Sequence, residues 1–319
     1  MDFNPCTKHK AVRKTVRKFA ETELGPISHE IDRDSRFPWE VIEKMGPLNY
    51  FGLQVPKKYG GAGLDTISYA ITIEEISRVC AAVGLCVTVH NSVGAYPIVL
   101  FGTEDQKKRF LPLLASGETI GAFCLTEANA GSDAGAVETT AVYDNGEYVV
   151  NGTKVFVTNG GVCGLAHIFA ITDPDNPRSG ASVFMVEKSM PGFAVGELED
   201  LCGMRANPVS SLFLEDVRLP ESHLLGRLGD GLKIGLSALD TRGTPLDKEG
   251  DLWATFDADD GLPGLNLYAI VGDAVGVWTG TMSNGLGRLD HGGTLADKDD
   301  DLWTAYGYWD GMNSSTVLA

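Results

Sequence analysis

The pattern of hydrophobic and polar residues divides the chain into three parts. From residue 7 to about 117, apolar residues recur every three or four positions, which is the spacing of helices with one buried face. Thr103 followed three positions later by Gln106 is typical of a capping box, so a helix is predicted to begin directly after Thr103. The first part is therefore predicted to be an N-terminal helical domain, residues 1–118.

From residue 119 the period changes to two, as expected for β-strands. Asn145-Gly146 lies between two of these strands and predicts a tight hairpin. No helical pattern alternates with the strands, so parallel units with helical crossovers are not expected. An antiparallel β domain is predicted over 119–228, followed by a short helical segment at 229–243. The predicted strand segments are 120–126, 141–150 (two strands joined by the turn at 145–146), 153–159, 167–173, 182–188 and 210–219.

The last part, residues 244–319, has a different composition. It holds thirteen Asp or Glu against three Lys or Arg, twelve glycines and four of the five tryptophans of the chain. Two stretches, 235–255 and 285–305, align at a spacing of 50 residues and share an Asp-Leu-Trp tripeptide. Such a period is typical of propeller or solenoid repeats, because each unit buries its face only against a neighbour. We therefore predict an acidic, Gly-, Asp- and Trp-rich β-repeat tail.

Composition and charge restrict the class of protein. The 319 residues are 43% apolar and 22% charged, a globular ratio, and the net charge of −17 argues against nonspecific nucleic-acid binding. No run of eighteen apolar residues occurs, so no membrane-spanning helix is expected. The six cysteines form no CxxC pair, which favours a reducing, cytoplasmic location over a disulfide framework or a zinc site. The basic segment 8–18 is followed by Glu21 and Glu23, so we interpret it as an exposed helical face rather than a targeting signal.

Two segments at strand ends are candidates for chemistry. In the loop 124–133 the small residues would let the backbone approach a ligand, and Thr126 and Ser132 offer hydroxyls; the same residues could form only a turn. In the segment 156–161, Phe156 next to Thr158 could hold a flat ring system by stacking and by a hydrogen bond at its edge. An ordinary exit from a strand into a turn explains that spacing equally well.

Taken together, the two segments are more specific than either alone. Residues 1 to about 240 resemble the acyl-CoA dehydrogenase family, in its short-chain or butyryl-CoA branch. Residues 124–136 fit the first signature of that family, and 155–161 fit its flavin-stacking segment. Further matching segments are 57–63, 101–118, 151–160, 188–193 and 203–220.

The resemblance implies an α+β fold and a flavoprotein oxidoreductase of fatty acid β-oxidation. FAD would lie between the β domain and a C-terminal helical bundle. The activity would be α,β-dehydrogenation of a short-chain acyl-CoA in a homotetramer, with electrons passing to electron transfer flavoprotein. The residues implied in FAD binding are Phe123, Cys124, Leu125, Thr126, Ser132, Phe156, Val157 and Thr158. The residues implied in acyl-CoA binding are Ser132, Asp240 and Arg242.

The resemblance ends at residues 240–243. The family has an Asp, two residues and then an Arg at this point, whereas Asp240 and Arg242 are separated by only one residue. From 244 onward nothing resembles the C-terminal helical bundle, which carries the catalytic glutamate of the family and much of its tetramer interface. Glu249 is the sole glutamate after Glu221 and lies in a Gly- and Asp-rich turn, so it is expected to be solvated. We therefore assign no catalytic base.

In place of the bundle, residues 260–290 resemble a two-component-regulator type of β-propeller repeat. The C-terminal helical bundle is thus expected to be missing and replaced by a partial propeller-like repeat, with impaired turnover as the consequence. The aspartate runs near 257–260 and 299–301 lack EF-hand spacing, so no metal site is predicted. Two alternatives stay open: a noncatalytic remnant that binds FAD or acyl-CoA, and a chimeric fragment whose functional part is a sensor-propeller tail.

Overall fold

The computed structural model describes residues 6–176 and 180–239, together with four strands between residues 267 and 306. The chain divides into two compact units, one of residues 5–245 and one of residues 246–319 with the first four residues. The predicted substrate residues Asp240 and Arg242 lie outside the described residues, as does Glu249.

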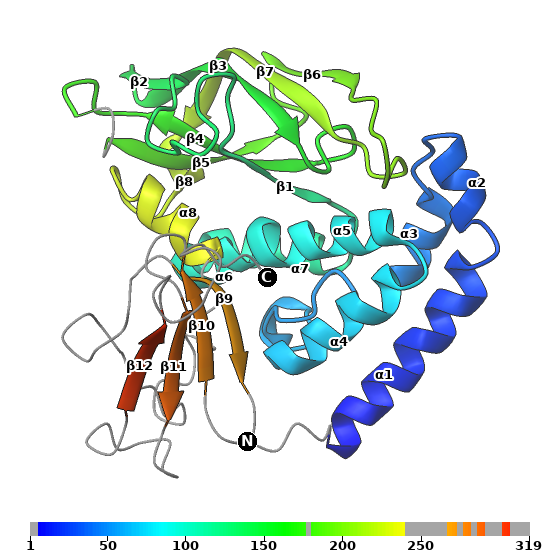
Figure 1. The fold of residues 1–319 in the computed structure, drawn as a ribbon. Coiled ribbons are helices and arrows are strands. Elements are labelled where there is room, and N and C mark those ends of the chain that lie inside the picture. Colours follow the sequence, from blue (N-terminus) through cyan, green and yellow to red (C-terminus); the bar gives the residue numbers. More distant parts are fainter. Residues whose placement is uncertain are drawn as a thin grey trace. The chain divides into compact units, whose positions relative to one another are not determined.

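The N-terminal part of the larger unit is helical, as predicted (Figure 1). The predicted capping box is confirmed: the Gln106 N–H donates to the Thr103 hydroxyl over 3.2 Å, and the Thr103 N–H donates to the Gln106 amide oxygen over 2.8 Å. These two bonds satisfy N–H groups that have no partner inside the helix. The helices are α1 (Thr7–Phe19), α2 (Ser28–Arg33), α3 (Trp39–Met45), α4 (Thr66–Ser77), α5 (Ala81–Val89), α6 (Tyr96–Phe101) and α7 (Glu104–Ala115), with π-helical turns at Ala20–Leu24 and His90–Ala95 and a 3-10 turn at Lys57–Tyr59.

Basic residues of α1 pair with acidic residues of α4. Arg13 and Arg17 donate to the fully buried Glu75 carboxylate over 2.6 and 2.7 Å, and this bonding lowers the pKa of Glu75 although burial opposes it. One side of the basic segment 8–18 therefore neutralises a buried acid, because an unpaired buried carboxylate would be costly.

The run Ala81–Phe101 is long and apolar enough to span a membrane by length and composition alone. Of its most apolar window, 67% is buried inside the protein, as expected for a core helix. His90 in this run is fully buried: its Nδ1 accepts from the Gly121 N–H over 3.0 Å, so its Nε2 carries the proton and donates to the Leu114 carbonyl over 3.1 Å. Burial lowers the pKa of His90 to about 4.

The β domain is one eight-stranded sheet in the order β6-β7-β3-β2-β4-β5-β8, with β1 paired to β4. The predicted hairpin is confirmed, since Asp144 pairs with Glu147 and both Asn145 (φ 54°) and Gly146 (φ 90°) adopt the left-handed conformation that such a turn needs. The strands are β1 (Gly121–Cys124), β2 (Thr140–Asp144), β3 (Glu147–Val157), β4 (Leu165–Ile171), β5 (Ala181–Glu187), β6 (Phe193–Leu198), β7 (Ser210–Pro220) and β8 (Leu224–Leu225), with a 3-10 turn at Glu221–His223.

The prediction of an antiparallel sheet is wrong in part, because the sheet is mixed. Strands β1 and β2 both run parallel to β4, whereas the other pairs are antiparallel. A parallel pair needs a long crossover, which is usually a helix. Here the crossover from β1 to β4 consists of a loop and the β2–β3 hairpin. The absence of an alternating helical pattern therefore does not exclude parallel strands in this sheet.

All seven residues of β4 are buried, because both faces of this strand are covered. On one face Ala166 and Ile168 pack with the inward residues of β3, β5 and β7. On the other face Leu165 and Phe169 pack with residues of α6 and α7, so the helices lie against one side of the sheet (Figure 1). This interface fixes the ends of β1 and β3 relative to the helical domain.

The last described helix of the larger unit is α8 (Gly231–Leu239), which contacts β5 and α6 and is the helix predicted after residue 229. Gly235 lets α8 approach the sheet, because a Cβ at this position would come within 3.1 Å of the Phe169 ring. The smaller unit contains a four-stranded antiparallel sheet of β9 (Leu267–Gly272), β10 (Val277–Thr281), β11 (Leu286–Asp290) and β12 (Leu302–Tyr306). Four strands are the size of one propeller blade, and the propeller itself stays a prediction.

Candidate functional site

The two segments singled out in the sequence are joined by a backbone hydrogen bond. The Val155 N–H donates to the Thr126 carbonyl over 3.0 Å. A β-bulge makes this bond available: Lys154 pairs with Leu212 and Val157 with Ser210, so β3 has one residue more than β7 at this point. The unpaired stretch of β3 is thus turned toward the loop that follows β1.

Phe156 lies in this bulge and has two unusual properties. Its φ angle is +54°, a left-handed conformation that costs a residue with a Cβ roughly 1–2 kcal/mol. Its side chain is 65% exposed, although aromatic rings are usually buried. Strained residues are concentrated at functional sites, where the strain presents a side chain to a ligand. The fold therefore presents an aromatic ring at the point where the two segments meet.

A buried ion pair holds the same two segments together from the inside. The Lys154 Nζ donates to Glu127 Oε1 over 2.6 Å, to the Phe169 carbonyl over 2.6 Å and to the Leu125 carbonyl over 3.4 Å. Lys154 is fully buried and Glu127 is 7% exposed. Three acceptors match the three N–H donors of an ammonium group, so the structure suits the charged form of Lys154.

The Glu127 carboxylate also joins the two ends of the loop that runs from Glu127 to Thr139. Glu127 accepts from the backbone N–H of Glu138 over 2.5 Å and from that of Thr139 over 3.1 Å. Burial raises the pKa of Glu127, but the Lys154 ammonium and these N–H donors outweigh burial and hold the pKa below its ordinary value. Burial in turn lowers the pKa of Lys154, and the bond to Glu127 opposes this effect.

A second buried polar side chain, Asn159, follows the bulge. It is fully buried, has a φ of +66°, and its Nδ2 donates to the carbonyls of Cys86 in α5 and Gly121 in β1, each over 3.2 Å. Its Oδ1 accepts from the Asn207 side chain over 3.1 Å. The bulge is thus anchored on both sides, by Lys154 before it and by Asn159 after it.

The predicted site residues are not equally accessible to a ligand. Among the described residues, none hydrogen-bonds the hydroxyls of Thr126, Ser132 and Thr158, so these groups are available; Ser132 is exposed and the other two are half-buried. Phe123 and Leu125 are half-buried. The side chains of Cys124 and Val157 point into the core, and burial raises the pKa of the Cys124 thiol well above its usual value. A ligand could meet these two residues only through the main chain.

An apolar cavity of about 40 Å³ lies beside the first loop. It is bounded by the loop, by β4 and β5, and by one face of α8. Its lining residues are Leu125, Ala134, Gly135, Phe169, Ala181, Leu232, Gly235 and Leu236. The start of α8 therefore adjoins the candidate site.

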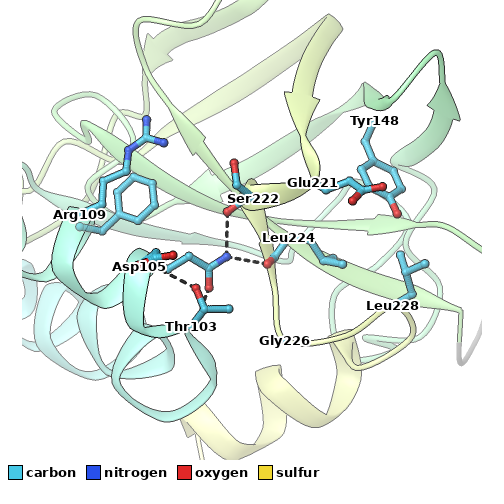
Figure 2. A pocket seen from close by; sticks show the side chains of 11 residues that line it. Thr103, Asp105, Arg109, Tyr148, Glu221, Ser222, Leu224, Gly226 and Leu228 are labelled. Carbon is cyan, nitrogen blue, oxygen red and sulfur yellow. Dashed lines mark hydrogen bonds between the residues drawn. The ribbon is translucent and has the colours of Figure 1, made fainter.

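A larger hollow of about 560 Å³ lies elsewhere, between α7 and the segment 221–228 (Figure 2). None of the predicted site residues lines it, and two of its polar side chains, Arg109 and Gln106, are already engaged within the protein. Arg109 pairs with Glu187, and the Gln106 amide donates to the carbonyls of Ser222 and Leu224 over 2.8 Å each. We therefore place the candidate site at the linked loops, although their cavity is smaller.

The sequence prediction missed the roles of Glu127, Lys154 and Asn159. Lys154 had a detectable signal, because the alternation of β3 places it at an inward position with Tyr148 and Val150. A lysine at a core position requires a buried acceptor, and a glutamate in the neighbouring motif supplies one. The bulge that exposes Phe156 had no comparable signal.

Comparison with known proteins agrees with the fold of the N-terminal helical and β domains. Residues 7–118 match the family described as acyl-CoA dehydrogenase, N-terminal domain, and residues 122–217 match acyl-CoA dehydrogenase, middle domain. Through these two domains the chain belongs to the acyl-CoA dehydrogenase family. The resemblance read from the two motifs is confirmed for this part of the chain.

Among curated proteins, the chain is 46% identical to an acyl-CoA dehydrogenase of Bacillus subtilis over 228 residues, which are 72% of this chain and 60% of that protein. It is 45% identical to the short-chain specific acyl-CoA dehydrogenase of Clostridium acetobutylicum over 240 residues, which are 75% of this chain and 63% of that protein. The chain thus spans about 60% of the length of these relatives.

Solved structures show the same similarity. Butyryl-CoA dehydrogenase from Megasphaera elsdenii aligns with a TM-score of 0.73 and 36% identity, over 75% of this chain and 63% of that one. A chain from a study of the electron transferring flavoprotein of Acidaminococcus fermentans aligns with a TM-score of 0.73, 40% identity and the same coverage. An acyl-CoA dehydrogenase from Bacillus anthracis, solved in complex with FAD, aligns with a TM-score of 0.67 and 35% identity over 74% of this chain and 40% of that one. Homologues in this family therefore bind FAD.

Proposed function

We propose that this chain is a flavin-dependent acyl-CoA dehydrogenase homologue that binds FAD at the two linked loops. The observation that carries the proposal is the bond from the Val155 N–H to the Thr126 carbonyl, because it brings together the two segments that resemble the flavin-binding segments of the family. The exposed, strained Phe156 lies next to this bond.

The residues present suit a flavin. A flavin ring has flat apolar faces and a polar edge, so it needs an aromatic or apolar surface and hydrogen-bond donors beside it. Phe156 offers the surface, and the hydroxyls of Thr126 and Thr158 offer donors. Ser132 on the exposed part of the first loop would bond a phosphate or sugar of the cofactor, or the coenzyme A part of the substrate. Cys124 and Val157 would contribute main-chain contacts only.

The proposed substrate is a short-chain acyl-CoA, and the proposed electron acceptor is electron transfer flavoprotein. The short-chain relative and the butyryl-CoA dehydrogenase structure support the former, and the structure from the flavoprotein study supports the latter. When bound, FAD supplies a hydride acceptor. The protein would position the acyl thioester beside Thr158, with Ser132, Asp240 and Arg242 as proposed substrate contacts, and would exclude water from the reacting carbons.

We further infer that turnover is impaired. Removal of the α-proton needs a free, positioned base. The Glu127 carboxylate of the first loop is held by Lys154 and by two backbone N–H groups, so it is not free to take a proton. After Glu221 the sequence offers one glutamate, Glu249, in a turn-like acidic context. The engagement of Glu127 in these bonds favours a second candidate function, in which the chain binds FAD or acyl-CoA without turnover.

Titration of the purified full chain with FAD, followed by a butyryl-CoA-dependent dye-reduction assay, tests both statements. We expect stoichiometric FAD binding with little or no turnover. The Phe156→Ala variant should weaken FAD binding, whereas Tyr143→Ala, which removes a 55% exposed aromatic on β2, should not. Failure of the native chain to bind FAD would refute the site, and robust turnover would refute the impairment.

A further inference from the structure

The Lys154–Glu127 pair connects the three elements that build the candidate site. Lys154 is on β3, two residues before Phe156, and Glu127 directly follows Thr126 in the first loop. The third acceptor of Lys154, the Phe169 carbonyl, is on β4, which carries one wall of the small apolar cavity. One ammonium group therefore joins both segments of the candidate site and strand β4.

Stability alone gives no reason for this arrangement. A buried ion pair contributes little to folding, because the cost of removing two charges from water cancels most of their attraction. Well-packed apolar residues of similar volume do as well or better. What an ion pair with several directional bonds does supply is a fixed separation between the groups that it joins. At this site the ion pair joins the loop that contains Thr126 to the part of β3 that contains Phe156. The distance between these two segments determines whether a flat ring can bind to both.

We propose that Lys154 and Glu127 are positioning residues that set the spacing and orientation of Thr126 and Phe156 for the cofactor. This inference rests on the proposed function. Lys154 fixes β3 at the start of the bulge and holds the Leu125 carbonyl, and Glu127 closes the first loop through the N–H groups of Glu138 and Thr139. Loss of either partner removes the side-chain bond between the loop and the strand and leaves the backbone bond from Val155 to Thr126 without this support, even though both side chains are buried.

The test uses the full chain and four variants: Lys154→Met, Glu127→Gln, the double variant, and Arg109→Met as a control. Arg109 forms a comparably short pair with Glu187, but at the surface and away from the loops. Three quantities are measured for each protein: the urea midpoint of unfolding, the dissociation constant for FAD from flavin fluorescence, and the visible circular dichroism of bound flavin, which reports how the ring is held.

We expect each single variant to lower the urea midpoint and to raise the FAD dissociation constant at least tenfold. The double variant leaves no unpaired charge, so its midpoint should return toward that of the native chain, while the dissociation constant stays raised and the flavin dichroism stays altered. Arg109→Met should bind FAD within twofold of the native chain. A double variant with native affinity and native dichroism would show a purely structural pair and overturn the proposal.

Two further measurements cover other outcomes. If the single variants do not fold, the double variant and Lys154→Arg, which keeps the charge but changes the geometry, carry the same test. If the native chain binds no FAD, the proposed function fails. Hydrogen exchange then tests separately whether the Lys154–Glu127 pair holds the first loop against β3. The Val155 amide should exchange at least tenfold faster in the double variant than in the native chain. Equal exchange would show that the pair does not hold the two segments together and would overturn the proposal.

Discussion

Replacing Asn159 by alanine tests the anchor on the far side of the bulge. The side chain is fully buried and takes part in three hydrogen bonds, two to backbone carbonyls and one from Asn207. Its backbone is left-handed, with φ +66°, a conformation that asparagine tolerates better than alanine. The Asn159→Ala variant therefore removes the bonds and adds backbone strain.

The expected loss follows from these contacts. Each buried bond contributes about 1 kcal/mol net, so three bonds give about 3 kcal/mol. The left-handed conformation adds about 1 kcal/mol for alanine. We expect Asn159→Ala to lower the free energy of unfolding by about 4 kcal/mol. Asn159→Gly should lose up to about 0.5 kcal/mol less, because glycine avoids the strain of about 1 kcal/mol but pays roughly 0.5–1 kcal/mol for its greater freedom in the unfolded chain.

The assay is equilibrium unfolding in urea, followed by far-ultraviolet circular dichroism. The matched control is Asn151→Ala, which removes an exposed asparagine on β3, the strand that precedes Asn159; its side chain makes two hydrogen bonds with Asp216. This control should cost about 1 kcal/mol or less, because water replaces exposed bonds. Equal losses for Asn159→Ala and Asn151→Ala would refute the reasoning that Asn159 anchors the two domains.

Three further predictions concern the loops and the buried histidines. Gly131→Ala should change the free energy of unfolding by no more than about 0.5 kcal/mol, since a Cβ there meets nothing within 4 Å. The same variant should weaken FAD binding, because the added methyl group keeps the backbone away from the ligand. Unchanged affinity in a fluorescence titration would contradict this. Phe156→Gly should unfold at the same or a higher urea concentration, by up to about 1 kcal/mol, while losing FAD affinity, and a large loss of stability would show that the ring packs in the apoprotein. Burial lowers the pKa of both His90 and His167 from 6.5 to about 4. The stability that their neutral forms give is therefore complete above pH 6.5 and is lost as the pH falls toward 4, by about 3 kcal/mol for each histidine. His167→Leu should reduce the loss of stability measured by urea unfolding between pH 7 and pH 4.5, and an unchanged pH dependence would rule out His167 as a contributor.

Local rules predicted much of the fold because they depend on neighbouring residues. The capping box at Thr103 and the hairpin at Asn145 each need only a few adjacent positions, and both are confirmed. The parallel pairing of β1 with β4 depends on residues about forty positions apart. Alternation of side chains gives strands but not their direction, so the mixed sheet was not accessible from the pattern.

The candidate site shows the same division. The motifs that contain Thr126 and Phe156 were visible in the sequence, but their contact depends on a bulge that adds one residue to β3. Lys154 and Glu127 were visible as residues, and only the fold shows that they form a pair. Strain at Phe156 is a property of the folded backbone, and no sequence pattern reports it.

The central claim is that the two loops form one FAD site. Hydrogen exchange of the full chain with and without FAD measures this directly. The account predicts that FAD slows exchange together in residues 123–132 and 155–158, and leaves the α7 segment that lines the larger hollow unchanged. Protection confined to one loop, or located around Gln106 and Arg109, would contradict it.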